Sequence, residues 1–207
     1  MSELFEFRTE DLVSEVTAKE LLFPFFGEFT SIWHRAWELY AQVPEEIRGR
    51  LAETSFIPAV NIFGLAQSLA KETFSNRENE GLVVCNELGV FGVYVEEKLL
   101  LRFNTLDSNH LVHNTQCKTS TERREQYYAQ EPIYGINNSA TRLTIGGIAN
   151  AAKTGLESVV VSCQVGDSLH YSFSTDNADG AVIAGPAGTV SPQPGNITDN
   201  LDIRKPR

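Results

Sequence analysis

The fold is decided by the segment GLVVCNELGVFGVYVEEKLLLRFNT, which occupies residues 81–105. Valine, leucine, phenylalanine and tyrosine dominate this segment, and only two short joints, at Gly89 and at Glu97-Lys98, interrupt it. The sequence therefore predicts three successive β-strands, at residues 82–88, 90–96 and 99–105. Joints this short connect antiparallel neighbours, because a parallel crossover needs a dozen or more residues. We expect an antiparallel meander here.

A second group of strands follows after residue 140. Its members are expected at residues 142–146, 157–165 and 168–175. Gly166-Asp167 suits a two-residue hairpin between the last two strands, with glycine in the first position. In the last strand apolar and polar residues alternate, which predicts one surface that faces water. The pattern leaves open whether the two groups form one sheet or two.

Helical patterns occupy the region before residue 81. The run from Thr17 to Glu20 is a capping box with Thr17 as the N-cap, and Pro24 limits or bends the helix that starts there. Pro44 and Pro58 mark the first turns of two later helices. The helix between Pro24 and Pro44 has its apolar residues at helical spacing: Phe29, Ile32, Trp33, Ala36 and Tyr40.

A polar helix is expected between the two groups of strands, at residues 119–130. Beyond residue 176, glycine and proline are frequent and aliphatic residues are few, which is typical of a flexible tail. The chain is therefore expected to be an α+β protein. Residues 1–80 would form a helical region, residues 81–175 a β-rich region packed with it as one domain, and residues 176–207 a flexible tail.

Composition and charge exclude several classes of function. The chain has 207 residues and a formal net charge of −10, and a negative field repels a polyanion, so direct binding of nucleic acid is not expected. The N-terminus lacks the basic and apolar segments of a signal peptide, and no apolar run approaches the roughly 20 residues of a membrane span. We expect a cytoplasmic protein without a membrane segment. The three cysteines are widely spaced, which favours reduced thiols over disulfides.

The densest set of potential metal ligands is His110, His113 and Cys117. Imidazole and thiolate groups bind zinc, but three residues of one short segment rarely complete a four-ligand site. They remain weak candidates, and no metal or other cofactor is expected.

Other patterns resemble catalytic motifs without completing one. Glu96-Glu97-Lys98 matches the Glu-x-Lys of metal-dependent nucleases, yet it falls at an expected turn. Cys163 and His170 lie close in the sequence, but strand alternation places them on opposite faces of the sheet. The glycine-rich runs lack the spacings of nucleotide-binding loops. No catalytic residue is therefore assigned, and the sequence leans away from an enzyme.

Aromatic and arginine residues are candidate contacts for a partner protein. Trp37 falls beside the apolar stripe of its helix, where a partly exposed side chain could contact a partner. Burial in the core is the favoured interpretation, because tryptophans are highly buried on average. Arg123 and Arg124, with Tyr127 and Tyr128, would form a small basic and aromatic surface on the 119–130 helix. The candidate contacts on this surface are Arg123, Arg124 and Tyr128. Glutamates flank the two arginines, so ion pairing along the helix is the favoured interpretation for them.

Several stretches together resemble a group of uncharacterised bacterial and prophage proteins. These stretches are residues 26–29 with Trp33 and Trp37, residues 81–103, and residues 140–146. Members of the group are encoded next to helix-turn-helix or metallopeptidase-like regulators, and the similarity spans about residues 20–175. The resemblance implies a role that depends on a partner, such as the antitoxin or regulator half of a two-gene module. It transfers no functional residues.

The sequence thus predicts a non-enzymatic interaction protein, an antitoxin-like or regulatory subunit that binds another protein. A basic partner would suit the acidic chain. Two alternatives stay open: a metal-assisted hydrolase or nuclease with an unrecognised site, and an acidic inhibitor that mimics DNA. The second needs carboxylates arrayed like phosphates, whereas the acids here are interspersed with bases. The identity of the partner and the oligomeric state are left open.

Overall fold

The structure is a computed structural model that describes residues 11–52, 57–87, 90–112, 121–133 and 135–176. The helices before the sheet are α1 (Glu15–Leu22), η2 (Phe23–Phe25), α2 (Phe26–Ala41), α3 (Glu45–Ala52), α4 (Ile57–Phe74) and η3 (Glu78–Glu80). The remaining elements are β1 (Leu82–Glu87), β2 (Val90–Val95), β3 (Leu99–Leu106), α5 (Thr121–Tyr128), β4 (Thr141–Ala149), β5 (Leu156–Val165) and β6 (Ser168–Ser174). The expected tail lies, except for Asp176, outside the described residues.

The six described strands form one sheet in the order β1-β2-β3-β4-β5-β6. Neighbours are antiparallel except at β3 and β4, which run parallel from Leu99 opposite Thr141 to Leu106 opposite Ile148. The predicted α+β class, with about six strands and an intervening helix, is confirmed, and the two groups of strands form one sheet. The predicted antiparallel pairing within each group is confirmed. The parallel pairing lies between the two groups, whose relation the sequence left open, and residues 107–140 are long enough for the crossover that it needs.

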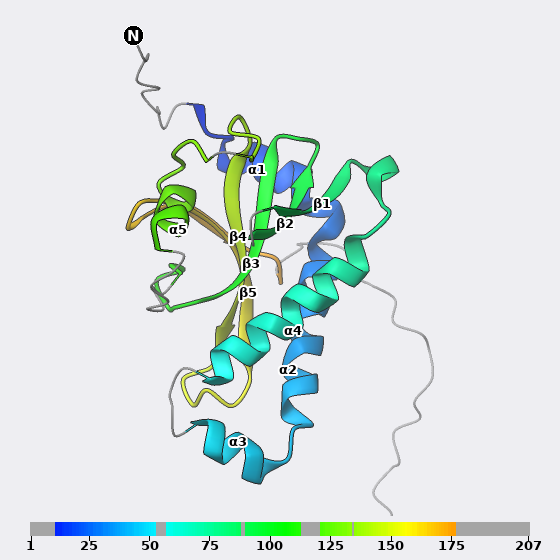
Figure 1. Ribbon diagram of the computed structural model, residues 1–207, viewed down its shortest axis with the longest axis vertical. Coiled ribbons are helices and arrows are strands. Elements are labelled where there is room, and N and C mark those ends of the chain that lie inside the picture. Colours follow the sequence, from blue (N-terminus) through cyan, green and yellow to red (C-terminus); the bar gives the residue numbers. More distant parts are fainter. Residues whose placement is uncertain (1–10, 53–56, 88–89, 113–120, 134, 177–207) are drawn as a thin grey trace, which may run out of the picture.

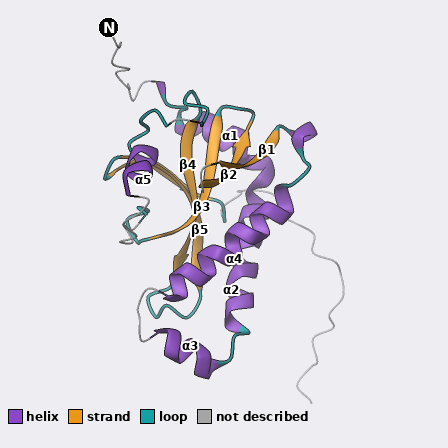
Figure 2. Cartoon of the chain, viewed as in Figure 1, coloured by secondary structure: helices purple, strands orange, loops and turns teal. Residues whose placement is uncertain are grey.

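The two faces of the sheet are covered by different helices (Figures 1 and 2). Helices α1, α2 and α4 lie on one face, and the main core fills the space between them and the strands. Its centre is aromatic, with Phe29 of α2 in contact with Phe74 of α4 and Phe103 of β3. Helix α5 lies on the other face, over a smaller apolar cluster that includes Leu100 and Tyr127.

The predicted stripe of α2 is confirmed, since its five apolar residues are all buried. The predicted N-cap of α1 is wrong. Ser14 caps this helix, and its Oγ accepts a hydrogen bond from the backbone N–H of Thr17 at 3.2 Å. Serine is as good a cap as threonine, and starting one turn earlier lets α1 bury Ala18 and Leu22 within a regular helix.

Gly147 allows α2 to approach β4 closely. A Cβ atom at this position would lie 2.6 Å from Cε3 of Trp33 and 2.9 Å from Cδ1 of Leu156. The indole of Trp33 is fully buried, and its Nε1 has no hydrogen-bond partner among the described residues. Packing against this glycine therefore holds the ring in place.

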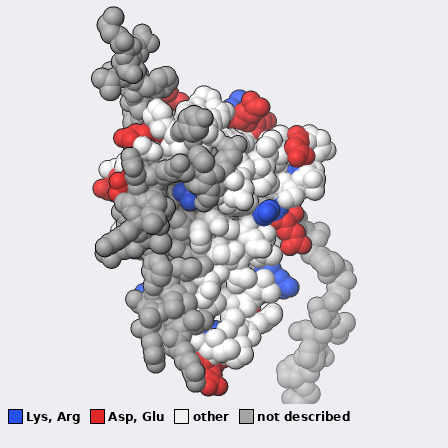
Figure 3. All heavy atoms as spheres, in the orientation of Figure 1, with Lys and Arg blue, Asp and Glu red and all other residues white. Residues whose placement is uncertain are grey.

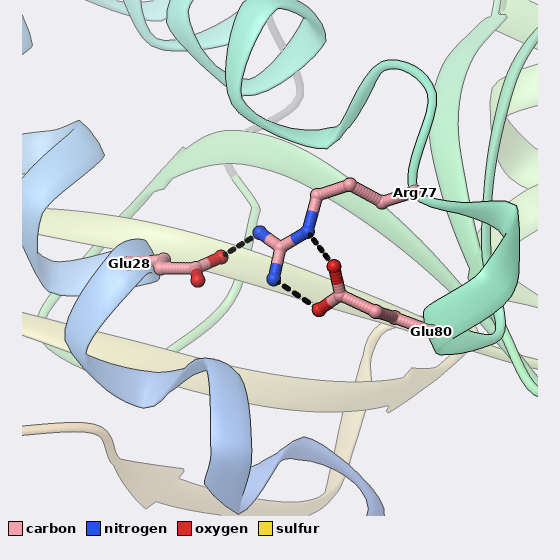
Figure 4. Close-up of polar contacts among 3 residues, drawn as sticks. All are labelled: Glu28, Arg77 and Glu80. Carbon is pink, nitrogen blue, oxygen red and sulfur yellow. Dashed lines mark hydrogen bonds and ion pairs between the residues drawn. The ribbon is translucent and has the colours of Figure 1, made fainter.

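Arg77, between α4 and η3, ties the end of α4 to α2 (Figure 4). Its Nη1 lies 2.6 Å from Oε2 of Glu28, and its Nε and Nη2 lie 2.9 Å and 2.5 Å from the two carboxylate oxygens of Glu80. The guanidinium also lies 5.7 Å from the ring centres of Phe25 and Phe74. The hydrogen bond from Arg77 lowers the pKa of Glu80. These contacts brace the helical layer just before the sheet begins.

Within the described residues, no helix has the length and apolar character needed to cross a membrane.

Candidate functional site

The residues expected to contact a partner lie on both sides of the sheet. Trp37 on α2 is half-buried and makes an edge-to-face contact with Tyr40, with 6.4 Å between ring centres. Tyr128 on α5 is buried on the opposite face. Arg123 and Arg124 also belong to α5, but their side chains are outside the described part of the chain. Trp37 and α5 therefore do not share one surface.

The suggested metal ligands are only partly described. His110 lies in the loop after β3, where its Nδ1 is 2.7 Å from Oγ of Ser172. His113 and Cys117 fall outside the described residues, so the ligand set stays a prediction. Among the residues that are described, no three histidine, cysteine or acidic side chains converge in a way that could hold a metal ion.

The nuclease-like triplet sits on the turn between β2 and β3, where it was expected. Glu96 and Glu97 have φ angles of 49° and 56°, and Nζ of Lys98 pairs with Oε2 of Glu96 at 3.1 Å. These side chains are largely exposed. The carboxylates therefore belong to a charged turn and do not converge on a buried strand, as the nuclease chemistry requires.

Cys163 and His170 lie on opposite faces, as the strand alternation predicts. Cys163 is buried on the face covered by α1, α2 and α4 and pairs across the strands with Tyr171, whereas His170 is exposed. Burial raises the pKa of the Cys163 thiol to about 12. The nucleophilic thiolate is therefore scarce, and its suggested base is on the wrong side of the sheet.

Tyr127 fixes α5 to the seam between β3 and β4. Its hydroxyl lies 3.0 Å from the carbonyl oxygen of Leu100 and 3.1 Å from that of Leu143, so it donates between the two strands. The side chain is 1% exposed, and burial raises its pKa well above the usual value. Tyr127 is consequently a neutral donor that joins the helix to both sides of the parallel pair.

Arg142 and Gln130 continue this polar layer beneath the end of α5. The amide of Gln130 pairs with the backbone of Arg142, accepting from its N–H at 3.0 Å and donating to its carbonyl at 2.8 Å. The guanidinium of Arg142 donates to the carbonyls of Gln126 and Glu131 and to the side-chain oxygen of Asn138. The hydrogen bonds of the buried guanidinium are thus accepted by neutral oxygens at the end of α5 and in the loop after it, and they hold these two segments together.

A hollow of about 290 Å³ opens between α5 and the turn from β5 to β6. Its lining consists of Val112, Glu125, Tyr128, Ala129, Gln164, Gly166 and Asp167. The backbone N–H of Gly166 donates to the carbonyl of Tyr128 at 2.9 Å, which joins the turn to the helix. The Nε2 of Gln164 donates to the carbonyl of Gly166 at 2.6 Å. The first bond joins the two walls of the hollow, and the second lies within the wall formed by the β5–β6 turn.

The lining of the hollow includes one aromatic side chain, Tyr128, and two acidic residues, Glu125 and Asp167. Glu125 and Asp167 are both exposed, and in the described part of the chain neither carboxylate forms an ion pair or a hydrogen bond. The hydroxyl of Tyr128 accepts a hydrogen bond from Nδ2 of Asn104 at 3.3 Å, and Ala129 adds an apolar surface. This arrangement suits a lysine or arginine side chain, whose methylene groups pack on apolar surface while the charged end stays near water.

The loop after β3 is anchored beside this hollow. Oγ of Ser162 donates to the carbonyl of His110 at 2.7 Å, in addition to the contact between His110 and Ser172. Oδ1 of Asp107 accepts from two backbone N–H groups of the same loop and closes it into a tight turn. A serine and histidine pair acts in catalysis when a third group orients the imidazole, and the described residues provide no such group. We interpret the pair as an anchor for the loop.

Sequence reasoning missed Glu125, Gln164 and Asp167 as residues of a site. The sequence pattern predicts Glu125 as an ion-pair partner on a helix and Asp167 as the second residue of a hairpin turn. The water-facing surface predicted for β6 correctly includes Ser172, which is half-buried beside His110. The crossover between β3 and β4 places α5 next to the β5–β6 hairpin. No local sequence pattern predicts this contact.

In the view of Figure 3, carboxylates are scattered singly or in small groups among uncharged side chains. This view gives no support to the row of negative charges that a DNA mimic would need.

No family model matches this chain, and comparisons with curated proteins and with solved structures give no match.

Proposed function

We propose that this protein is a non-enzymatic interaction subunit, antitoxin-like or regulatory, that binds a basic segment of another protein. The supporting observation is the hollow beside α5, where Glu125 and Asp167 are unpaired in the described part of the chain and stand next to the surface of Tyr128 and Ala129. A bacterial or prophage two-gene module, as the resemblance implies, would be the setting for such a subunit.

Electrostatics favours a cationic group at this position. A lysine or arginine would place its charge near the two exposed carboxylates, and each exposed ion pair contributes about 0.2–1 kcal/mol. These charges would therefore guide orientation and association more than they would determine affinity. The formal net charge of −10 adds a long-range attraction for a basic partner. Binding should consequently weaken as the salt concentration rises.

The walls of the hollow are already in position without a ligand. The bond from Gly166 to Tyr128 joins the β5–β6 turn to α5, and Gln164 braces the same turn. Oε1 of Gln164 also accepts a hydrogen bond from the backbone N–H of Val112 at 3.4 Å, and Val112 is a further residue of the lining. A preorganised site loses less conformational entropy when its ligand binds.

Charge reversal at the hollow tests the proposal. The double variant Glu125→Lys with Asp167→Lys should lose a stoichiometric partner that the wild-type protein recovers from its source cells under mild salt. The matched control, Glu20→Lys with Glu72→Lys, makes the same change of charge at exposed positions on α1 and α4, on the opposite face of the sheet. This control should recover the partner as the wild type does.

Two outcomes would contradict the proposal. Recovery of the partner by the Glu125 and Asp167 variant at wild-type yield would exclude the hollow as the binding site. Failure of the wild-type protein to recover any stoichiometric partner would remove the interaction role itself. Circular dichroism of each variant establishes that the fold is retained before binding is compared.

A further inference from the structure

The two edges of the sheet are built differently. At the β6 edge the pairing with β5 shifts register between Cys163 and Gln164, and Nζ of Lys19 from α1 lies 5.2 Å from the ring centre of Phe173. Bulges and lysines near an edge strand are devices that block pairing with another chain. At the other edge, β1 pairs with β2 without a shift from Leu82 to Glu87. Residues 82–86 contain no charged residue and no proline.

The backbone groups of β1 that point away from the sheet can be identified. The N–H of Glu96 donates to the carbonyl of Gly81 at 2.8 Å, so Gly81 faces β2. Because the ladder alternates, the N–H and C=O groups of Leu82, Val84 and Asn86 point outward. The N–H of Leu82 bonds to the turn before the strand, at 3.3 Å. In the described part of the chain, the outward groups of Val84 and Asn86 form no hydrogen bond.

We propose that β1 pairs antiparallel with β1 of a second copy of this chain, across a twofold axis at Val84. In this register Val84 faces Val84 of the second copy, and Leu82 faces Asn86. The outward groups of Val84, the N–H of Asn86 and the carbonyl of Leu82 then all meet a partner, while the N–H of Leu82 keeps its bond to Arg77. A shift of two residues either way leaves one of the three outward residues without a partner. The resulting interface is isologous, since the same strand contributes both sides.

The side chains also complement one another in this register. Val83 is 43% exposed and would lie next to Cys85 of the second copy, on the sheet face that bears α5. Among residues 82–86 no charge meets a like charge, because there is none. Two copies of this strand can therefore pair without charge repulsion. The edge lies at the opposite end of the strand order from the β5–β6 turn. The proposal does not depend on the proposed function.

Proline at position 84 provides a direct test. The N–H of Val84 points outward, so Val84→Pro removes a bond to the second copy and none to β2, and proline is tolerated on edge strands in this orientation. Two intermolecular hydrogen bonds are lost, one per copy, which should weaken dimerisation about 30-fold. The control Val84→Ala keeps the N–H and should remain dimeric. Sedimentation equilibrium of the full chain over a concentration series measures the change.

A cysteine at position 83 tests the register independently of that variant. Residues opposite each other in a non-hydrogen-bonded antiparallel pair have Cα atoms about 4.5 Å apart, which suits a disulfide. Mild oxidation of Val83→Cys should therefore give a covalent dimer through Cys85 of the second copy. The double variant Val83→Cys with Cys85→Ser should not cross-link, and neither should Val16→Cys, whose position on α1 is 66% exposed.

A wild-type protein that is monomeric across the concentration series would overturn the proposal. A Val84→Pro variant that keeps a native circular dichroism spectrum and dimerises as strongly as the wild type would do the same. Cross-linking that persists without Cys85 would refute the register.

Discussion

Replacing Gly147 by alanine should destabilise the protein by about 2 kcal/mol. The added Cβ would lie 2.6 Å and 2.9 Å from two atoms of the Trp33 ring and 2.9 Å from Cδ1 of Leu156. Inserting a methyl group into a packed core costs about 1–3 kcal/mol, and a rigid, fully buried indole favours the upper end. Loss of glycine's freedom in the unfolded chain offsets about 0.4–1 kcal/mol of that cost.

Urea denaturation followed by circular dichroism measures this difference. For a chain of this size, 2 kcal/mol corresponds to a fall of about 4–8 °C in Tm. Gly64→Ala is the matched control, because its Cβ on α4 would have no atom within 4 Å. A Gly64→Ala chain should gain about 0.5–1 kcal/mol from better helix propensity. Stability unchanged or raised in Gly147→Ala would show that α2 does not rest on β4 through Trp33.

Three further outcomes follow from buried or paired groups. Tyr127→Phe removes the donor to two strand carbonyls and should cost about 1–2 kcal/mol of unfolding free energy, measured by urea denaturation. The pKa of Glu80 is lowered from 4.5 by its bond to Arg77, so this ion pair stabilises the fold above pH 4.5 and is lost as the pH falls through the lowered pKa. The stability difference between wild type and Arg77→Met should therefore shrink in acid; a difference independent of pH from 7 to 3 would contradict the assignment. Burial raises the pKa of Cys163 to about 12, so an alkylating reagent at neutral pH should modify this thiol only after unfolding, as peptide mass mapping would detect.

The periodicity of apolar residues was sufficient to predict the individual helices and strands. The α2 stripe and the strands around residues 81–105 were predicted because each element buries one face, and the chain repeats apolar residues at the period of that face. The cap of α1 was placed one turn late, because Ser14 and Thr17 can both serve as a cap and only the packing of Ala18 and Leu22 selects between them.

Contacts between distant segments were not predictable in the same way. The parallel seam depends on how residues 107–140 cross the sheet, and this segment contains no strong periodic pattern. The hollow beside α5 needs both that crossover and the bond from Gly166 to Tyr128. Glu125 and Asp167 are ordinary surface acids when read in sequence. Their significance comes from lining the same hollow as Tyr128.

The parallel seam also has a consequence for the folding route. Strands β1 to β3 can pair through short connections, and so can strands β4 to β6. Pairing of β3 with β4 requires closure of the long crossover between Leu106 and Thr141. We therefore expect two three-stranded halves to form early and the seam to close late, secured by Tyr127. Native-state hydrogen exchange should then report a partial opening along the middle of the sheet, in which each half keeps its own protection.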